Sequence, residues 1–446
     1  MYSEKQLKRV TDLALAHSKA DQTEVILIAT DLALTRFANN YIHQNIAQKD
    51  TTLSIRAVVG KKVGIVSANS LESEAVRRAV ETAQELARHQ VENQDFRSLP
   101  VPRPISQVDG FVEATARLTP AARARMAGVV CRRAKEAGLV AAGSISRVVS
   151  RVVVANSLGL FAQHASTSAE MTALVMGDSG SGYAHRLCVD AAQMDAESVA
   201  EEAVGRARRG QNPIALPPGE YPVVLQPYAV SDILDFFGYL SFGAQAYHEG
   251  RSFMSGKLGQ RAMGENIRIW DDGLSLETVP FPFDFEGVPK RRVDFILDGM
   301  AKEVCYDSYT AGKEGKESTG HALPPEFATF GPMPGHLFLG VGDAPLEDMV
   351  SRLDKGLLVT RFHYTRVVEP MRVMMTGMTR DGTFLVERGA IVAPVKNLRF
   401  TQSYLEAMNR VEAIGCDARL VRTAGGPNFV PALKIAGWNF TGATEF

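Results

Sequence analysis

The chain has 446 residues, which is too many for a single ordinary core, so two domains of roughly 200 residues each are expected. Its composition, 45% hydrophobic and 22% charged, is that of an ordinary globular protein and excludes a disordered or fibrous one. The 49 Lys and Arg residues balance 50 Asp and Glu residues, and this balance leaves no overall positive field to attract nucleic acid.

Neither the first residues nor the cysteines indicate secretion or a membrane. Residues 1–20 place Leu7, Val10 and Leu13 on one helical face and lack the apolar core of a signal peptide. No segment has the apolar length that spans a bilayer. The four cysteines are far apart and form no CxxC pair: Cys131, Cys188, Cys305 and Cys416. Dispersed thiols are typical of a reducing compartment, so we expect a cytoplasmic protein.

The first part of the chain predicts a helix followed by an antiparallel meander. After the helical start, β-branched residues separated by turn residues predict strands near 24–30, 32–38, 41–47, 51–59 and 62–67. A helix over 71–89 carries one apolar stripe, which we expect to lie on this sheet.

Residues 90–118 are rich in proline and lack periodicity, so they predict a long surface crossing. The next helix has clear ends, because Thr119-Pro120 is a favoured start and Gly138 a favoured left-handed end. Two further elements follow, a β-hairpin and a helix: 145–176 and 196–209.

A proline-rich segment at 211–219 marks the expected domain boundary. We therefore expect an α+β fold of two domains. Residues 1–210 would form an antiparallel sheet with packed helices, and residues 211–446 a β-rich, barrel-like or sandwich-like domain with a few helices. Those helices are predicted at 229–248, 345–355 and 403–412. Asp381-Gly382 tolerates the positive φ of a primed turn and predicts a hairpin at 378–383.

His248 and Glu249 are two letters of the motif with which many zinc peptidases bind their metal. In that motif a second histidine follows four or five residues later on the same helical face, but Ser252 and Phe253 occupy those positions. Gly250 also ends a helix directly after the pair. His248 is better explained as a residue at the carbonyl end of a helix dipole. The later histidines are irregularly spaced and predict no metal site: His321, His336 and His363.

Other catalytic motifs are absent. The sequence has no GxSxG elbow, no Walker loop and no GxGxxG that enters a helix. The glycine-rich segment 177–182 lacks the Lys and the following helix of a phosphate cradle, so it predicts a hairpin loop. The basic clusters at 206–209 and 290–292 are expected to be solvated surface.

A set of short segments in a fixed order carries a family resemblance. In chain order they are 63–67, 156–159, 253–259, 284–288, 296–299, 308–311, 318–322, 375–382 and 389–397. Together they resemble the TldD/PmbA family over nearly the whole chain. Each segment alone is weak evidence for the family, whereas their combination in this order is specific to it.

The resemblance implies a subunit of a heterodimeric cytosolic zinc peptidase. In that family the TldD-type subunit carries an HExxxH motif on the helix that opens the second domain, and a late cysteine ligand. The PmbA or TldE type lacks both. Here the helix near 229–248 has no HExxxH, residues 421–426 have no cysteine, and Cys416 lies upstream at a position that does not match. The chain therefore resembles the TldE-type subunit, with no catalytic residue, metal or cofactor of its own and with zinc in a TldD-like partner.

An extended peptide can pair its backbone by adding to an exposed sheet edge. We therefore expect this chain to complete a peptide-binding channel for a TldD-like partner, which supplies the zinc, the water and the glutamate base. The candidate channel residues are Glu286, Ser318, Thr319, Gly320, His321 and Arg361. The plain structural alternatives are a tight turn at 318–320 and an ion pair between Glu286 and Arg291.

Two other functions stay open at the level of sequence. One is a self-sufficient hydrolase whose groups come from distant segments. The other is a protein-interaction module, because members of the resembled family have been described as modulators of DNA gyrase. A homodimer is a further possibility where the partner is missing.

Overall fold

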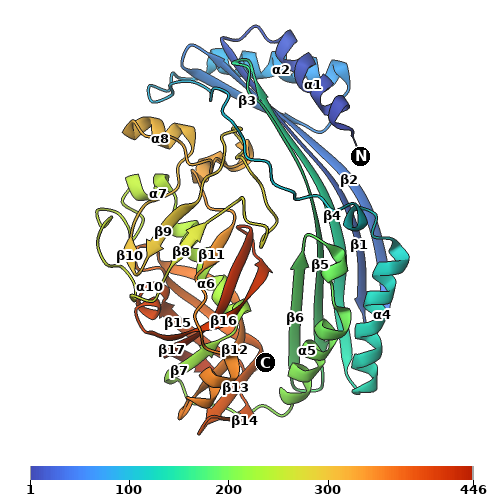
Figure 1. Ribbon diagram of the computed structural model, residues 1–446, viewed down its shortest axis with the longest axis vertical. Helices are drawn as coiled ribbons and strands as arrows, with labels where there is room; N and C mark the ends of the chain where they lie inside the picture. Colours follow the sequence, from blue (N-terminus) through green and yellow to red (C-terminus); the bar gives the residue numbers. More distant parts are fainter. Residues whose placement is uncertain (1, 444–446) are drawn as a thin grey trace.

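The computed structural model describes residues 2–443, which form two β-sheets with helices packed on them. The first sheet is antiparallel and has the strand order β3-β2-β1-β4-β5-β6. Its strands are β1 (Gln22–Ala38), β2 (Tyr41–Val59), β3 (Lys62–Ala68), β4 (Val140–Asn156), β5 (Phe161–Met176) and β6 (Ser181–Cys188). Figure 1 shows this sheet as a long curved layer beside the second half of the chain.

The first sheet is built from two copies of one motif: a helix, three strands and a second helix. The copies run α1–β1–β2–β3–α2 and α4–β4–β5–β6–α5. Their helices are α1 (Glu4–His17), α2 (Ser73–His89), α4 (Pro120–Glu136) and α5 (Ala196–Arg209). The first strands of the two copies, β1 and β4, pair in the middle of the sheet. The strand order therefore has an internal two-fold symmetry, with β3 and β6 at its two ends.

Alternate residues of this sheet face two different cores. On β1, Val25 and Leu27 pack against α1 and α2, whereas Ile26 packs with Phe283 from the second half of the chain. Side chains alternate between the two faces of a strand. Glu24 is two residues from Ile26, so its side chain lies on the same face of β1 and faces the second half of the chain.

The predicted helices and hairpin of this region are confirmed as α2, α4, α5 and the β4–β5 pair. The Thr119 hydroxyl caps α4 by accepting from the Ala122 N–H, and Gly138 has a positive φ of 71°. The hairpin loop predicted at 177–182 is the turn between β5 and β6 over residues 177–180, and Ser181 and Gly182 already belong to β6. Residues 90–118 are mostly irregular and contain only the one-turn helix α3 (Glu113–Ala116) among elements of the structure described here.

The predicted division of the first strands was wrong, because 24–30 and 32–38 are one strand, as are 41–47 and 51–59. β1 continues through Asp31, whose Oδ1 lies 2.8 Å from Nη1 of Arg147 on β4. β2 continues through residues 48–50, whose side chains are exposed. A polar residue does not end a strand when its side chain is paired or faces water.

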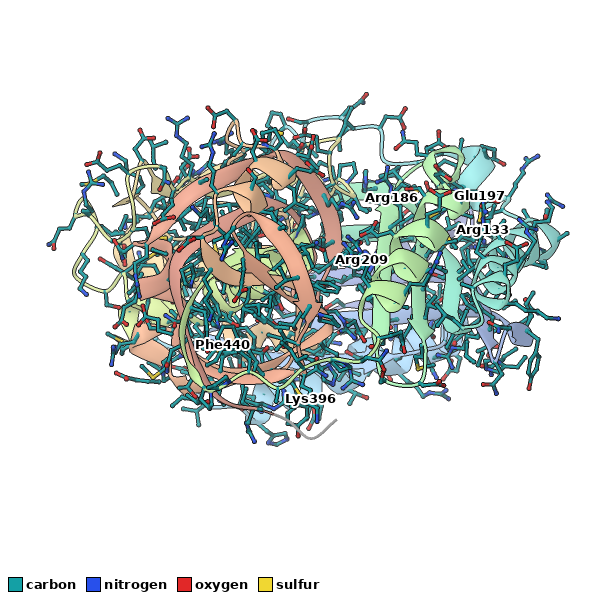
Figure 2. All side chains as sticks on the ribbon, turned by 90° about the horizontal axis from the view of Figure 1, so that it is seen from below. Arg133, Arg186, Glu197, Arg209, Lys396 and Phe440 are labelled. Atoms are coloured by element: carbon teal, nitrogen blue, oxygen red, sulfur yellow. The ribbon has the colours of Figure 1, made fainter. Side chains whose placement is uncertain are left out.

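The second sheet has eleven strands, and five of them close into a ring. The strands β17, β15, β13, β12 and β7 lie side by side, and β7 pairs back with β17. Figure 2 shows these strands curved around, with Phe440 of β17 on the ring. They are β7 (Gly219–Leu225), β12 (Lys355–Glu369), β13 (Met374–Glu387), β15 (Leu398–Ser403) and β17 (Pro427–Ala443). This confirms an α+β protein with a barrel-like second half.

The remaining strands extend this ring. β14 (Ala390–Pro394) pairs with β13, and β16 (Val411–Arg422) pairs with β17. A path of short strands leads away from β17: β11 (Leu337–Leu339), β8 (Ile269–Asp271), β9 (Val293–Leu297) and β10 (Met300–Ala301). Helix α6 (Pro227–Leu240) packs against β12 and β17.

The predicted helix over 229–248 is in fact two helices, α6 and α7 (Ala244–His248). After α6 ends at Leu240, the ring of Phe242 stacks on Phe295 with centroids 4.2 Å apart. Cys305 holds the break, because its N–H donates to the Phe242 carbonyl and its own carbonyl accepts from the Ala244 N–H. These partners are distant in sequence, so the local pattern could not reveal the break.

Three smaller expectations also need correction. The helices predicted at 345–355 and 403–412 are shorter, α9 (Leu346–Ser351) and α10 (Tyr404–Met408). The hairpin predicted at 378–383 does not exist, because β13 runs straight through it. There the register changes from Val359 opposite Thr383 to Arg361 opposite Arg380, so β13 holds one extra residue. The positive φ of Asp381, 56°, serves this β-bulge and not a turn.

No helix in the described range 2–443 has the length and apolar character needed to cross a membrane.

Candidate functional site

A buried ion cluster joins the two halves of the chain along what we call the seam, the contact between the first sheet and the segments after residue 218. Arg56 of β2 lies between Glu24 of β1 and Glu286 of the second half. Its Nε is 3.2 Å from Glu24 Oε1, and its Nη1 donates to Glu286 Oε1 at 3.2 Å. Burial raises the pKa of Glu24 to about 7, although Arg56 opposes this rise. One cation thus faces two buried carboxylates.

Asp284 connects Glu286 to the predicted segment 318–321. Its Oδ1 accepts from the Glu286 N–H at 2.9 Å, and its Oδ2 accepts from the Ala322 N–H at 2.9 Å. Burial raises the pKa of Asp284 above its ordinary value, and the nearby Glu286 carboxylate adds to this effect. The second loop of the predicted site is therefore fixed to the first by main-chain bonds to one buried carboxyl group.

Ser318, Thr319 and Gly320 form a tight turn around Tyr306. The hydroxyls of Ser318 and Thr319 both donate to the Tyr306 carbonyl at 3.1 Å, and the Tyr306 N–H donates to Thr319 Oγ1 at 2.7 Å. Gly320 has a φ of 78°, and a β-carbon on it would lie 2.6 Å from the Pro289 carbonyl oxygen. Only glycine fits this position.

His321 is completely buried and bonded on both ring nitrogens. Nε2 lies 2.9 Å from Asp271 Oδ1, and Nδ1 lies 2.8 Å from the Thr319 hydroxyl. Burial raises the pKa of Asp271, but Lys290 and His321 outweigh it and hold that pKa well below its usual range. Burial and Lys290 lower the pKa of His321. His321 Nε2 can donate to Asp271, and Nδ1 also lies 3.0 Å from the Thr319 carbonyl oxygen, so both ring nitrogens have partners within the protein.

Arg361 lies at a different point of the seam, where β6 meets β13. Its Nε donates to Asp381 Oδ2 at 2.6 Å, and Ser181 of β6 donates to Asp381 Oδ1 at 2.6 Å. The guanidinium stacks over Tyr183, 4.5 Å from the ring centroid. The bulge at Asp381 therefore aims this carboxylate at both halves of the chain.

The predicted residues thus divide into two groups. Glu286 and the turn 318–321 lie together, whereas Arg361 lies elsewhere along the seam. Glu286, Thr319 and His321 are buried, and Ser318 and Arg361 are half-buried. The predicted ion pair between Glu286 and Arg291 does not form, because Glu286 binds Arg56 and Arg291 binds Glu303 at 2.7 Å.

The His248-Glu249 pair makes two unrelated surface contacts. His248 ends α7 and pairs with Glu314 of α8 (Ser308–Glu314), whereas Glu249 pairs with Arg251. This agrees with the assignment of His248 to the C-terminal end of a helix. No group of three or more His, Cys, Asp or Glu side chains in residues 2–443 is arranged to hold a metal ion.

Sequence reasoning missed a polar site on α6. Asp232 accepts from the Tyr404 hydroxyl at 2.6 Å and from the Thr365 hydroxyl at 3.0 Å. Burial raises the pKa of Asp232 to about 6 against both hydrogen bonds. One turn later, Asp235 accepts from the Thr423 hydroxyl and the Gly425 N–H. The sequence signal that could have revealed this site is the pair of carboxylates three residues apart in an otherwise apolar helix.

The protein is of the α+β class, with a repeated helix–strand motif, a ring-shaped second sheet and, on that ring, an apolar helix that carries two carboxylates. Family models match in three pieces. Residues 23–87 match PmbA/TldA metallopeptidase domain 1, residues 111–211 match the central domain, and residues 218–442 match the C-terminal domain. The chain therefore belongs to the PmbA/TldD family of metallopeptidases.

Curated relatives agree with this family, and solved structures share the fold. The metalloprotease PmbA of Escherichia coli O157:H7 is 24% identical over 96% of this chain and 95% of its own length. An uncharacterised protein of Methanocaldococcus jannaschii is 30% identical, but the match spans 41% of this chain and 44% of that relative. The crystal structure of TldE from Thermococcus kodakarensis has a TM-score of 0.89 and 20% identity over 98% of this chain and 100% of its own. A putative modulator of a DNA gyrase from Thermotoga maritima has a TM-score of 0.88 and 19% identity over 98% of this chain and 100% of its own.

The side chains of α6 do not fit a catalytic metal such as zinc, although the family name implies a metal. The helix contains no His, Cys or Glu. Both oxygens of Asp232 already accept hydroxyl protons, and Asp235 is held by Thr423 and Gly425. A zinc site needs three or four nitrogen, sulfur or carboxylate ligands around one point, and α6 offers two carboxylates that bind other groups.

Proposed function

We propose that this chain is the TldE-like subunit of a cytoplasmic, heterodimeric zinc peptidase and completes the peptide channel of a TldD-like partner. The observation that carries the proposal is the filled site on α6, where two carboxylates bind protein hydroxyls and a main-chain N–H. In this proposal the partner supplies the HExxxH helix, the zinc and the base. Unfolded peptides or peptide precursors are the substrates.

The seam gives the candidate residues distinct roles within this proposal. Ser318 and Arg361 are partly accessible and could contact a peptide directly. Glu286, Thr319 and His321 are buried and would act through the positions of the loops they bind. Residues 1–210 and 211–446 are proposed as the two domains, since each range holds its own sheet.

The experiment compares this chain alone, an HExxxH-bearing paralogue alone, and the two together. We expect zinc and cleavage of a casein-derived unfolded peptide only when the paralogue is present, and full cleavage only with both chains. A matched control replaces the glutamate of the paralogue's HExxxH by glutamine, which should abolish cleavage and leave the complex assembled. Zinc and cleavage from this chain alone would contradict the proposal.

A further inference from the structure

One edge of β5 is left without a strand partner over half of its length. β5 pairs with β4 from end to end, but β6 covers its other edge only from Ala169 to Met176. The stretch from residue 161 to residue 168 therefore borders no further strand of the described chain.

The direction of the main-chain groups along this edge follows from one hydrogen bond. The Thr167 N–H donates to the Gly110 carbonyl at 2.9 Å, which points Thr167 away from β4. Main-chain groups of residues two apart on a strand point the same way. Phe161, Gln163 and Ala165 therefore present N–H and C=O groups at what we call the open edge, and no other segment in residues 2–443 bonds to these groups.

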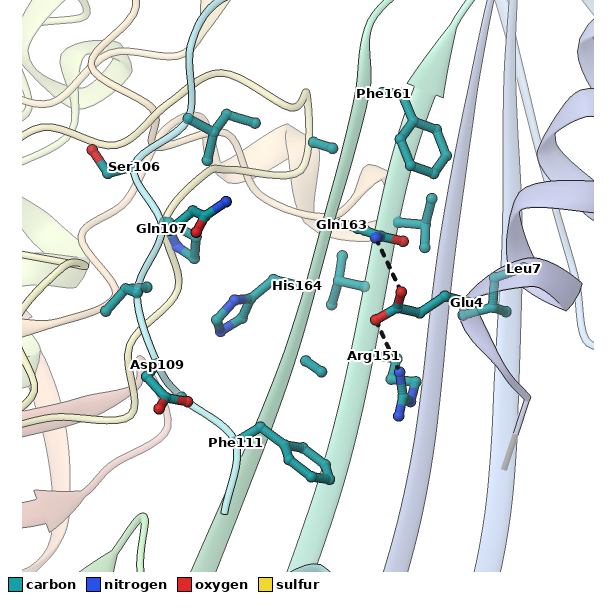
Figure 3. Close-up of a pocket in the computed structure, with 18 residues that line it drawn as sticks. Glu4, Leu7, Ser106, Gln107, Asp109, Phe111, Arg151, Phe161, Gln163 and His164 are labelled. Carbon is teal, nitrogen blue, oxygen red and sulfur yellow. Dashed lines mark hydrogen bonds and ion pairs between the residues drawn. The ribbon is translucent and has the colours of Figure 1, made fainter. Parts of the chain in front are cut away.

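A second unpaired main chain runs beside the open edge. Residues 101–109, here called the strap, cross from α2 toward α3 and meet β5 at Gly110. No hydrogen bond in the described structure uses the main chain of the strap. Figure 3 shows the strap, with Ser106, Gln107 and Asp109, on one side of a slot, β5 with Gln163 on the other, and His164 between them.

The slot is a real cavity, of about 440 Å³, lined by residues of the strap and of the open edge. Its far wall is formed by Pro282 of the second half, close to the point where His164 Nε2 bonds the Pro280 carbonyl at 3.0 Å. The hydrogen bond between Thr167 and Gly110 closes one end of the slot. An added strand would therefore lie beside residues 161–165, between β5 and the strap.

The side chains around the slot carry few charges, and two of them, Glu4 and Arg151, pair with each other. Arg151 Nη1 lies 3.7 Å from Glu4 Oε1, and the Gln163 side-chain amide donates to Glu4 Oε2 at 3.4 Å. Phe111 and Phe161 add apolar surface at its two ends. Among the described residues of the lining, Asp109 is the one further carboxylate, so the slot offers this charge beside the main-chain N–H and C=O groups of the open edge.

We infer that the slot binds an extended peptide, which adds to the open edge of β5 as an antiparallel or parallel strand. The five residues 161–165 offer about 17 Å of edge, enough for a peptide of about five residues. This inference deepens the proposed function, from which it takes only the substrate class, and assigns the first contact of an unfolded substrate to this subunit. Side chains of the peptide would alternate between Phe161 on one face and His164 on the other.

The first measurement is amide hydrogen exchange at single-residue resolution on the full chain. The probe is the capped heptapeptide Lys-Thr-Val-Thr-Val-Thr-Lys. We expect the Gln163 and Ala165 amides to exchange fast in the free protein and to be protected at least ten-fold by saturating peptide. The inward amides of Ala162 and His164, which bond to β4, should be protected in both states. Unchanged exchange at the open edge would overturn the inference.

Variants of the protein and of the peptide distinguish strand addition from binding that only covers the surface of the slot. Gln163→Pro removes one outward N–H without removing a ladder bond to β4, and it should weaken fluorescein-labelled peptide about ten-fold. Gln163→Ala keeps that N–H and should bind within two-fold of the wild type. A peptide N-methylated at alternate residues keeps one pairing edge and should bind, whereas methylation of every internal residue should abolish binding. Equal binding of all these peptides would contradict strand addition.

The test needs neither zinc nor cleavage, so it stands apart from the subunit proposal. Peptide protection with no gain of cleavage in the complex would support the slot and contradict the proposed function. Protection of the same amides by the HExxxH-bearing paralogue without peptide would assign the open edge to the subunit interface and overturn the inference.

Discussion

Gly64 of β3 lies so close to α2 that a β-carbon on it would sit 2.2 Å from the Ala83 carbonyl oxygen. The second copy of the motif repeats this contact, because a β-carbon on Gly182 of β6 would sit 2.2 Å from the Ala203 carbonyl oxygen of α5. In both copies the next contact is the amide nitrogen of the alanine four residues later, at 2.4 Å. The two-fold symmetry of the first sheet therefore extends to the glycine that seats each closing helix.

Gly64→Ala and Gly182→Ala should each lower the free energy of unfolding by about 1–3 kcal/mol, since the added methyl must push a helix backbone away. Urea denaturation measures this loss. Gly128→Ala in α4 is the matched control, because its added β-carbon meets open space and should stabilise the helix by about 0.5–1 kcal/mol. Equal stability of all three variants would contradict the close approach.

Arg56→Met should cost about 3–5 kcal/mol of stability, because it leaves Glu24 and Glu286 buried without a cation. Arg268→Met is the control. Its pair with Asp298 is exposed on both sides, and its loss should cost at most about 1 kcal/mol. Denaturant unfolding of both variants gives the comparison. Adding Glu24→Gln to Arg56→Met should recover part of the loss, and a purely additive double variant would argue against the ion cluster.

Glu24→Gln should change how stability depends on pH. The pKa of Glu24 rises from 4.5 to about 7 on folding, so its contribution is fully present below pH 4.5 and is lost as the pH rises to about 7. In that window the unfolded chain releases the proton while the folded chain keeps it. Glutamine has no proton to lose, so the variant should gain stability relative to the wild type as the pH rises from 4.5 to about 7, and the difference should then level off. A difference that does not vary with pH would disprove the raised pKa.

His321→Ala should destabilise the protein by about 1–3 kcal/mol, because it leaves Asp271 short of one buried hydrogen bond. His248→Ala lies on the surface and should stay within about 0.5 kcal/mol of the wild type. Thermal or urea unfolding measures both. In the reconstituted complex, His321→Ala should lose cleavage only as far as it loses folded protein. A loss of turnover with assembly and fold intact would show that His321 has a direct role in the channel.

The elements that sequence predicted well carry local signals. Thr119-Pro120 and Gly138 mark the two ends of α4 within the helix itself, and the apolar stripe of α2 needs no distant partner. The break at Phe242 and the bulge at Asp381 depend on contacts with Phe295 and Ser181, which no local pattern contains. The sequence predicted that the Asp381-Gly382 pair tolerates a positive φ, and Asp381 has one. That this φ serves a β-bulge and not a turn depends on the pairing of β13 with β12.

The candidate site shows the same limit. The alternative offered from sequence paired Glu286 with the nearby Arg291, whereas its partner Arg56 is 230 positions away. The family resemblance suggested these loops as candidates, but it did not show that His321 and Thr319 would be buried. The open edge of β5 was also out of reach, since it depends on where β6 begins to pair and on the path of the strap.

The last strand of the structure has a consequence for biosynthesis. β17 pairs with β7, β11, β15 and β16, so it supplies contacts to the ring and to the strands that extend it. A ribosome must therefore translate past Pro427 before the ring can close, and until then β7 and β15 each expose an unpaired side. The first sheet is complete at Cys188 and can form much earlier. The nascent chain thus passes through a long stage with one half folded and the other open to mispairing, which is the period when a chaperone would be needed most.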